Sequence, residues 1–185
     1  MYYHCSPIGG LTCLQPRKPH NFDKPPMVYM TTSLPMALMY GIRNFEYTYG
    51  YTKSGQIYYE EYFPDALQLL YGGKPAYLYE CAPQVTETTR IPNEVVSPLP
   101  VKIVRGSFIP DVMQALLEQE RLGTLEIRRY AQLPQPTRKW IFQAELEEIQ
   151  KQDLIRTQGP MAEYMKLHYP KSWAAACAKS NAPEE

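Results

Sequence analysis

Apolar and polar positions alternate with a period of two in several short segments of the first hundred residues. Tyr47, Tyr49 and Tyr51, for example, are separated by single polar or small residues, which is typical of a β-strand. Other runs are rich in β-branched and aromatic residues and are bounded by glycine, proline and other turn formers. We therefore predict strands over residues 1–5, 27–31, 47–51, 57–62, 76–82, 94–96, 101–104 and 125–130.

Helical spacing of apolar residues dominates after about residue 106. Two earlier helices are also indicated. One opens where Ser33 offers an N-cap and Pro35 suits the first turn, and the other ends at Gly72-Gly73. We predict helices over residues 34–42, 64–71, 110–122 and 137–155, and two more that open at Pro160 and Ser172. Thr137 is the expected cap of the helix over 137–155, whose inward side chains are Phe142, Leu146 and Ile149.

This change of pattern predicts an α+β protein with two parts. Residues 1–106 are expected to form the β-rich domain, and residues 107–185 a largely helical extension. The apolar stripes of the extension would form a larger exposed patch than monomers usually tolerate. We therefore expect these helices to pack onto the sheet or onto each other.

The charge of the chain narrows the range of partners. Lys+Arg and Asp+Glu each number 19, so the formal net charge is zero. This balance argues against nucleic acid as the main partner, since phosphate binding needs a basic surplus. The apolar runs are far shorter than the roughly 18 residues of a membrane span, and no signal peptide is indicated. We expect a soluble cytoplasmic protein with no membrane partner.

Cysteine and histidine are too few and too scattered to predict a metal site. No two cysteines have C-x-x-C spacing, and no histidines lie at a spacing that would complete a tetrahedral zinc site. The residues are Cys5, Cys13, Cys81, Cys177, His4, His20 and His168. Reduced thiols are the expectation for this pattern. The chain also has no phosphate-binding loop, dinucleotide glycine fingerprint or G-x-S-x-G elbow.

Three motifs on predicted strands remain, and their order carries a resemblance. They are Tyr3-His4-Cys5-Ser6, Val28-Tyr29-Met30-Thr31 and Asn93-Glu94-Val95-Val96. Together they resemble the ADP-ribosyltransferase fold in its His-Tyr-Glu branch, which includes diphtheria toxin and the poly-ADP-ribose polymerases. A second tyrosine, Tyr40, lies at the end of the helix after Tyr29, where polymerase members carry their second ring. The resemblance covers about residues 1–106.

The resemblance implies an ADP-ribosyltransferase-like split β-sheet and a reaction on NAD⁺. His4, Tyr29 and Glu94 would be the catalytic residues, and ADP-ribose would pass to an acceptor that the sequence does not identify. Breaking the bond between nicotinamide and ribose creates an oxocarbenium-like state, as in glycoside cleavage. A carboxylate near the ribose, Glu94, would stabilise that positive charge.

The resemblance also implies which residues bind NAD⁺. Tyr29 and Tyr40 would stack on the two faces of the nicotinamide ring. His4 would bind the adenine-side ribose, and the segment Cys5-Ser6 would receive the carboxamide. No metal is implied. We expect His4, Tyr29 and Glu94 to line one cleft between two small sheets.

Departures from the family pattern keep a second hypothesis open. Cys5 stands where the family usually has glycine, and Ala37 stands where polymerase members have a serine that binds the carboxamide. Pro92 excludes the E-x-E or Q-x-E signature, so the acceptor is not defined. The alternative is a catalytically inactive binding or interaction module on the same fold, because fold alone does not decide function. The tyrosines at 47, 49 and 51 are expected to pack against apolar groups and to have a structural role only.

Overall fold

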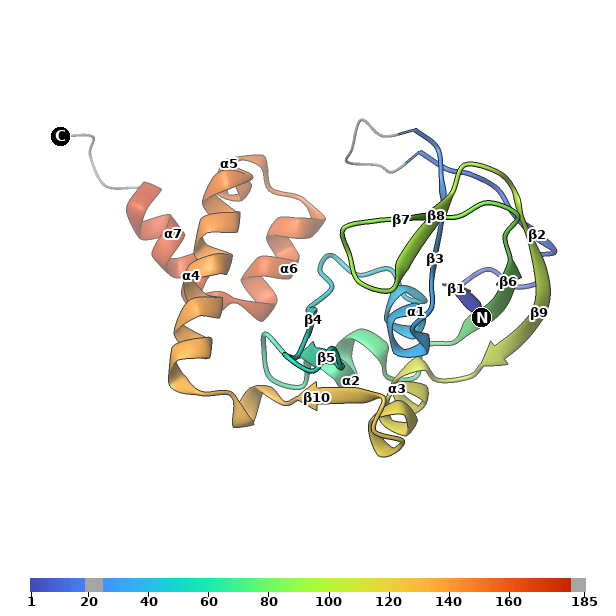
Figure 1. Cartoon of the computed structure of the whole chain (residues 1–185). Helices are drawn as coiled ribbons and strands as arrows, with labels where there is room; N and C mark the ends of the chain where they lie inside the picture. The colour runs from blue at the N-terminus through green and yellow to red at the C-terminus, as the bar shows by residue number, and fades with distance from the viewer. Residues whose placement is uncertain (19–24, 181–185) are drawn as a thin grey trace. The chain divides into compact units, whose positions relative to one another are not determined.

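The structure is a computed structural model that describes residues 1–18 and 25–180 (Figure 1). It is a mixed α+β structure, as the sequence predicts. Its strands are β1 (Tyr2–Ser6), β2 (Cys13–Leu14), β3 (Val28–Thr31), β4 (Tyr49–Tyr51), β5 (Ile57–Glu60), β6 (Ala76–Ala82), β7 (Glu87–Thr88), β8 (Glu94–Ser97), β9 (Val101–Ile109) and β10 (Leu125–Arg128). Its helices are α1 (Leu34–Tyr40), α2 (Ala66–Tyr71), α3 (Val112–Arg121), α4 (Gln135–Lys151), α5 (Leu154–Thr157), α6 (Pro160–His168) and α7 (Pro170–Ser180), with a 3₁₀ turn at Tyr130–Gln132.

The described residues group into two compact units. The first holds Met1–Tyr59 and Leu67–Ile127, and the second holds Glu60–Ala66 and the chain from Arg128 onward. The sequence-based division after residue 106 falls inside β9. That strand continues to Ile109 because it stays paired with β6, and α3 follows within the first unit.

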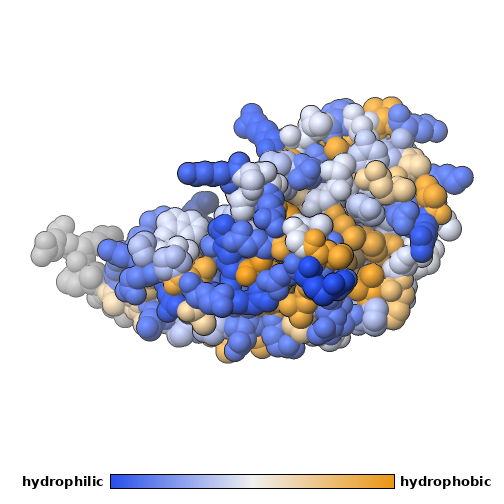
Figure 2. Space-filling view, turned by 60° about the horizontal axis from the view of Figure 1, so that its bottom comes forward, coloured by the Kyte–Doolittle hydropathy of each residue, from blue (hydrophilic) through white to orange (hydrophobic). Residues whose placement is uncertain are grey.

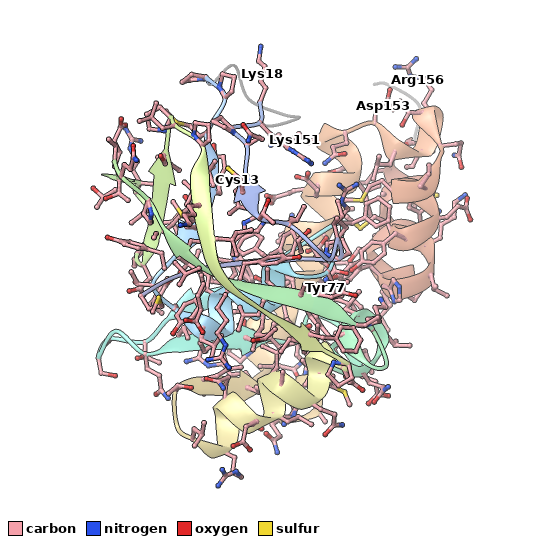
Figure 3. All side chains as sticks on the ribbon, turned by 90° about the vertical axis from the view of Figure 1, so that its right-hand side faces the viewer. Cys13, Lys18, Tyr77, Lys151, Asp153 and Arg156 are labelled. Atoms are coloured by element: carbon pink, nitrogen blue, oxygen red, sulfur yellow. The ribbon has the colours of Figure 1, made fainter. Side chains whose placement is uncertain are left out.

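The larger sheet belongs to the first unit and has the strand order β2-β9-β6-β1-β3-β8-β7. Neighbouring strands are antiparallel throughout. β6 and β9 are its long pair and run side by side, with Tyr77 labelled on β6 (Figure 3).

The sheet is weakly joined at its middle. β1 and β3 share the single register pair Tyr3–Thr31. In contrast, β1 pairs with β6 at five positions, and β3 pairs with β8 at four. Strands β2, β9, β6 and β1 therefore form one half-sheet and strands β3, β8 and β7 form the other, and the ladder between the two halves is reduced to one register pair.

Successive side chains of β3 point to opposite faces of the larger sheet, and one of these faces is packed in an apolar cluster. Val28 and Met30 are buried in the main apolar cluster of the sheet, together with Tyr79. Because successive side chains of a strand point to opposite faces, Tyr29 and Thr31 lie on the other face. Helix α1 contacts β1 and β3, and this helix covers that second face.

Helix α1 begins where the sequence predicts. Ser33 has an extended backbone and its hydroxyl accepts the N–H of Met36 at 3.4 Å, which is the geometry of an N-cap. Pro35 occupies the first turn, where a missing N–H costs nothing. The helix ends at Tyr40 and Gly41 follows it, slightly earlier than the predicted end at residue 42.

The predicted hairpin forms, with a shorter first strand. β4 pairs with β5, and β10 pairs with the other side of β5 to complete a three-stranded sheet. Gly55 in the connecting turn has φ +83°, a conformation that favours glycine. The prediction of a strand from residue 47 is wrong at its start. Tyr47 precedes β4, and its hydroxyl donates to the carbonyl of Ile42 at 3.0 Å.

The helices of the second unit pack on each other, which was one of the two expected arrangements. Helix α4 contacts α5, α6 and α7, and the Ser172 hydroxyl of α7 donates to the Phe142 carbonyl of α4 at 3.0 Å. In the same unit, the ring of Phe63 stacks on His168 with centroids 4.1 Å apart. These contacts bury Leu146 and Ile149 as predicted, whereas the Phe142 side chain is half-buried.

Two predicted helix starts in this unit are wrong. Thr137 lies inside the first turn of α4, which is capped by Pro134 without a side-chain hydrogen bond. Helix α7 begins at Pro170, so Ser172 lies within its first turn. In both helices a proline near the N-terminus sets the start, because its fixed φ suits a helical first turn.

No helix within residues 1–18 and 25–180 is long and apolar enough to span a bilayer. On the face drawn in Figure 2, groups of apolar residues are interspersed with strongly hydrophilic ones. The apolar surface of that face is therefore divided into patches.

Candidate functional site

A cavity of about 250 Å³ lies in the first unit, where β1 and β3 separate. Helix α1 and the start of β8 complete its walls. The lining residues are Tyr3, His4, Cys5, Tyr29, Met30, Thr31, Met36, Ala37, Tyr40 and Glu94. Its volume is just below the range of about 300–1,000 Å³ typical of small-molecule sites. It has room for part of a dinucleotide.

The cavity brings His4, Tyr29 and Glu94 together. Each comes from a different strand, and these strands, β1, β3 and β8, are neighbours in the sheet. The expected cleft between two small sheets takes the form of a split within one seven-stranded sheet.

The side chain of His4 connects β1 to β3, the two strands at which the half-sheets meet. Its Nδ1 lies 3.0 Å from the carbonyl oxygen of Tyr29. A carbonyl only accepts, so Nδ1 carries the proton, and Nε2 of the neutral ring is an acceptor. Burial lowers the pKa of His4, and the positive charge of Arg17 lowers it further, against the raising effect of the hydrogen bond to Tyr29. His4 is therefore a neutral hydrogen-bond acceptor at neutral pH.

Tyr29 and Tyr40 border the cavity from β3 and from the end of α1. Tyr29 is half-buried and Tyr40 is 38% exposed. Burial raises the pKa of Tyr40, and the neighbouring Tyr49 hydroxyl and the Glu94 carboxylate raise it further. Tyr40 is therefore a neutral aromatic ring at the rim of the cavity.

Glu94 is held at the start of β8 by the loop that precedes it. The Thr89 hydroxyl donates to Oε1 of Glu94 at 2.7 Å and accepts the N–H of Ile91 at 3.0 Å. Asn93 has φ +64°, so the chain turns sharply just before Glu94. The Tyr51 hydroxyl donates to the Pro92 carbonyl at 2.6 Å, which ties the loop to β4. The carboxylate makes no ion pair with any residue in the part of the chain that the structure describes.

Cys5 and Ser6 take different positions. Cys5 lines the cavity and is buried, and burial raises the pKa of its thiol to about 12. A thiol that stays protonated is not a nucleophile. Ser6 is buried outside the cavity lining, and its hydroxyl accepts the N–H of Ile8 at 3.1 Å. The structure therefore brings Cys5, but not Ser6, to the predicted binding site.

The tyrosines around β4 lie closer to the site than the sequence indicated. Tyr47 packs on the ring of Tyr40 with centroids 4.6 Å apart, and the hydroxyls of Tyr49 and Tyr40 are 3.1 Å apart. The ring of Tyr51 packs edge-on against Tyr49. The expectation that they pack only against apolar groups is wrong, because they support Tyr40 and the loop before Glu94 through their rings and hydroxyls.

Sequence reasoning missed the supporting residues of the site. Thr89 carried no recognisable motif, because its role depends on a hydrogen bond within an irregular loop. Thr31 could have been found, since a period of two places it on the same face as Tyr29. Tyr3 could not, because its place beside Thr31 depends on the pairing of β1 with β3. In the described residues, no group of three or more His, Cys, Asp or Glu side chains is arranged to hold a metal ion.

Comparison of the chain with protein-family models, with curated proteins and with solved structures gave no match.

The lowered histidine pKa values predict that acid destabilises the protein. The pKa values of His4 and His168 both lie below the ordinary 6.5, mainly through burial. The unfolded chain therefore binds protons first as the pH falls, so this part of the stability is present above about pH 6.5 and is lost below it. Urea unfolding at about pH 7.5 and about pH 5.5 should give a lower free energy of unfolding at the acidic pH. The His4→Asn variant, whose amide replaces Nδ1 as donor, should show a smaller loss, and an unchanged loss would contradict this assignment.

Proposed function

We propose that this protein binds NAD⁺ in the cavity and transfers its ADP-ribose to an acceptor, on an ADP-ribosyltransferase-like split β-sheet. One observation carries the proposal. His4, Tyr29 and Glu94, the residues that the family resemblance selects from three distant segments, line a single cavity on three adjacent strands. The separation of β1 from β3 at that place supports the same fold.

In this proposal the two tyrosines bind the nicotinamide ring. Tyr29 and Tyr40 border the cavity from different elements, and neither ring contacts the other. A flat ring between them would gain aromatic stacking on both faces. Nε2 of His4 is the acceptor available to a ribose hydroxyl, because Nδ1 is already used by the backbone.

In this proposal Glu94, which lines the cavity, supports the bond-breaking step. The bond between the nicotinamide nitrogen and C1′ of the ribose breaks, and both electrons leave with nicotinamide, which becomes neutral. The positive charge left on the ribose is stabilised by the Glu94 carboxylate. A lone pair of the acceptor then forms the new bond to C1′, and the acceptor proton passes to the carboxylate.

The second candidate is a binding module without turnover, and Ala37 favours it. This residue lines the cavity and is buried, and its methyl group offers no hydrogen bond to a carboxamide. The nicotinamide group would then be held by ring stacking and backbone contacts, without a side-chain hydrogen bond to its carboxamide. The NAD⁺ site would be the same, so the two functions differ in chemistry and not in ligand.

Two measurements on the full chain separate these functions. Calorimetric titration with NAD⁺ tests binding, and chromatography of the same mixture over time tests the release of nicotinamide. The transferase predicts binding and release, whereas the module predicts binding alone. Absence of NAD⁺ binding would contradict the transferase and the assignment of the site residues.

Removing the hydroxyl that orients Glu94 should slow the reaction. In Thr89→Val the carboxylate loses a hydrogen bond, and a bond to a charged group contributes on the order of 1.5 kcal/mol, so kcat should fall about tenfold. The KM for NAD⁺ should stay nearly constant, because Thr89 does not line the cavity. Thr89→Ser should keep the rate, and Thr88→Val on β7 is the matched control. A Thr89→Val enzyme with full kcat would show that this bond does not position Glu94.

A further inference from the structure

The cavity contains no positive charge to meet a dinucleotide. Its lining residues include one carboxylate, Glu94, and no lysine or arginine. The diphosphate of NAD⁺ is an anion, and proteins bind such groups with Arg, Lys or backbone N–H groups. A binding site for the whole dinucleotide therefore needs a cation just outside the cavity.

Arg17 has the right backbone position. It pairs with Met27, directly before β3, through two backbone hydrogen bonds of 3.0 and 3.1 Å. Directly opposed residues of an antiparallel pair carry their side chains on the same face. Met27 and Tyr29 are two residues apart, so they also share a face. The Arg17 side chain therefore lies on the face of the sheet that carries Tyr29.

The distance along β3 from Tyr29 to Arg17 matches the distance in NAD⁺ between the nicotinamide ring and the diphosphate. Two residues of a strand span about 6.7 Å, so Arg17 lies roughly that distance along β3 from Tyr29. A ribose separates nicotinamide from the first phosphate of a dinucleotide. A ring held at Tyr29 would place the diphosphate near Arg17.

The surroundings of Arg17 are consistent with a role in binding the diphosphate. The residue is exposed and makes no ion pair with a side chain in the described ranges. Its positive charge acts on His4, which crosses the split between β1 and β3 beside Tyr29. Arg17 is thus a cation close to the His4 end of the cavity.

We propose that Arg17 binds the diphosphate of the dinucleotide at the His4 end of the cavity. This inference rests on the proposed function, because it assumes that the nicotinamide half occupies the cavity. A guanidinium presents two parallel N–H donors to phosphate oxygens. The site would therefore select a dinucleotide over nicotinamide alone, through one residue that the sequence motifs do not include.

Calorimetric titration of the full chain with two ligands tests the proposal. Arg17→Ala should bind NAD⁺ about tenfold more weakly than the wild-type protein, since it loses a charge-assisted hydrogen bond. Its affinity for nicotinamide, which has no phosphate, should not change. Arg121→Ala is the matched control, because Arg121 is exposed on α3 and pairs with Glu118. That variant should bind both ligands as the wild type does.

The outcomes separate a failure of the proposed role of Arg17 from a failure of the proposed function. Equal NAD⁺ affinity of Arg17→Ala and Arg121→Ala would overturn the role of Arg17 and leave the proposed function intact. Equal loss of affinity for NAD⁺ and nicotinamide in Arg17→Ala would also overturn it, because it would indicate a structural role. Failure of the wild-type protein to bind NAD⁺ would contradict the proposed function itself, and this inference with it.

Discussion

Replacing Glu94 with glutamine should lower the rate of nicotinamide release from NAD⁺ by at least about 100-fold. Glutamine keeps the size of the side chain, and its carbonyl oxygen can still accept the hydrogen bond of Thr89. It lacks the negative charge that stabilises the positive ribose. NAD⁺ binding should change little, because stacking on Tyr29 and Tyr40 does not depend on that charge. Release is measured by chromatography and binding by calorimetry.

Glu87→Gln is the matched control for this variant. Glu87 is exposed on β7, the strand next to β8, and it does not line the cavity. It should release nicotinamide at the wild-type rate. Wild-type release by Glu94→Gln would contradict a catalytic role for the Glu94 carboxylate.

Replacing Gly41 with alanine should reduce the free energy of unfolding by about 1–3 kcal/mol. Gly41 follows α1 with φ −65°, a conformation that alanine adopts easily. A Cβ there would lie 2.5 Å from the Sγ of Cys5 and 3.2 Å from the Cβ of Ala76. Both neighbours are buried, so neither moves without repacking. The clash outweighs the usual gain of about 0.4–1 kcal/mol from a stiffer unfolded chain.

A double variant tests whether the Cys5 thiol causes this loss. Cys5→Ala removes the Sγ atom, so Gly41→Ala should be less destabilising in the Cys5→Ala protein than in the wild type. Urea unfolding of the four proteins gives the coupling between the two positions. Strictly additive effects would contradict the close contact of Cys5 with Gly41. The same contact means that the thiol fills the space over Gly41 at the end of α1.

Local patterns in the sequence predicted most elements of the fold. The alternation in β3 and β6 has a simple cause, because each strand has one face in a packed core. Ser33 and Pro35 located α1, since caps act within one turn of a helix. Helices α4 and α7 were predicted with wrong starts, because each has both a polar residue that can cap a helix and a proline that can open one, and the proline sets the start.

The site depends on contacts that join distant segments, and these are harder to predict from local patterns. The order of the three motifs led to His4, Tyr29 and Glu94, and the structure places them around one cavity. The separation of β1 from β3 follows from strand pairing across the sheet, which no single segment specifies. The hydrogen bond from Thr89 to Glu94 was missed for the same reason, because it arises from the folded shape of one loop.

A crystal structure of the Glu94→Gln protein with NAD⁺ tests the central claim most directly. The variant should hold the intact dinucleotide, because it binds NAD⁺ without cleaving it. We expect the nicotinamide ring between Tyr29 and Tyr40 and its ribose beside residue 94. Density for NAD⁺ at another place, or an empty cavity at a concentration that saturates the calorimetric signal, would contradict it.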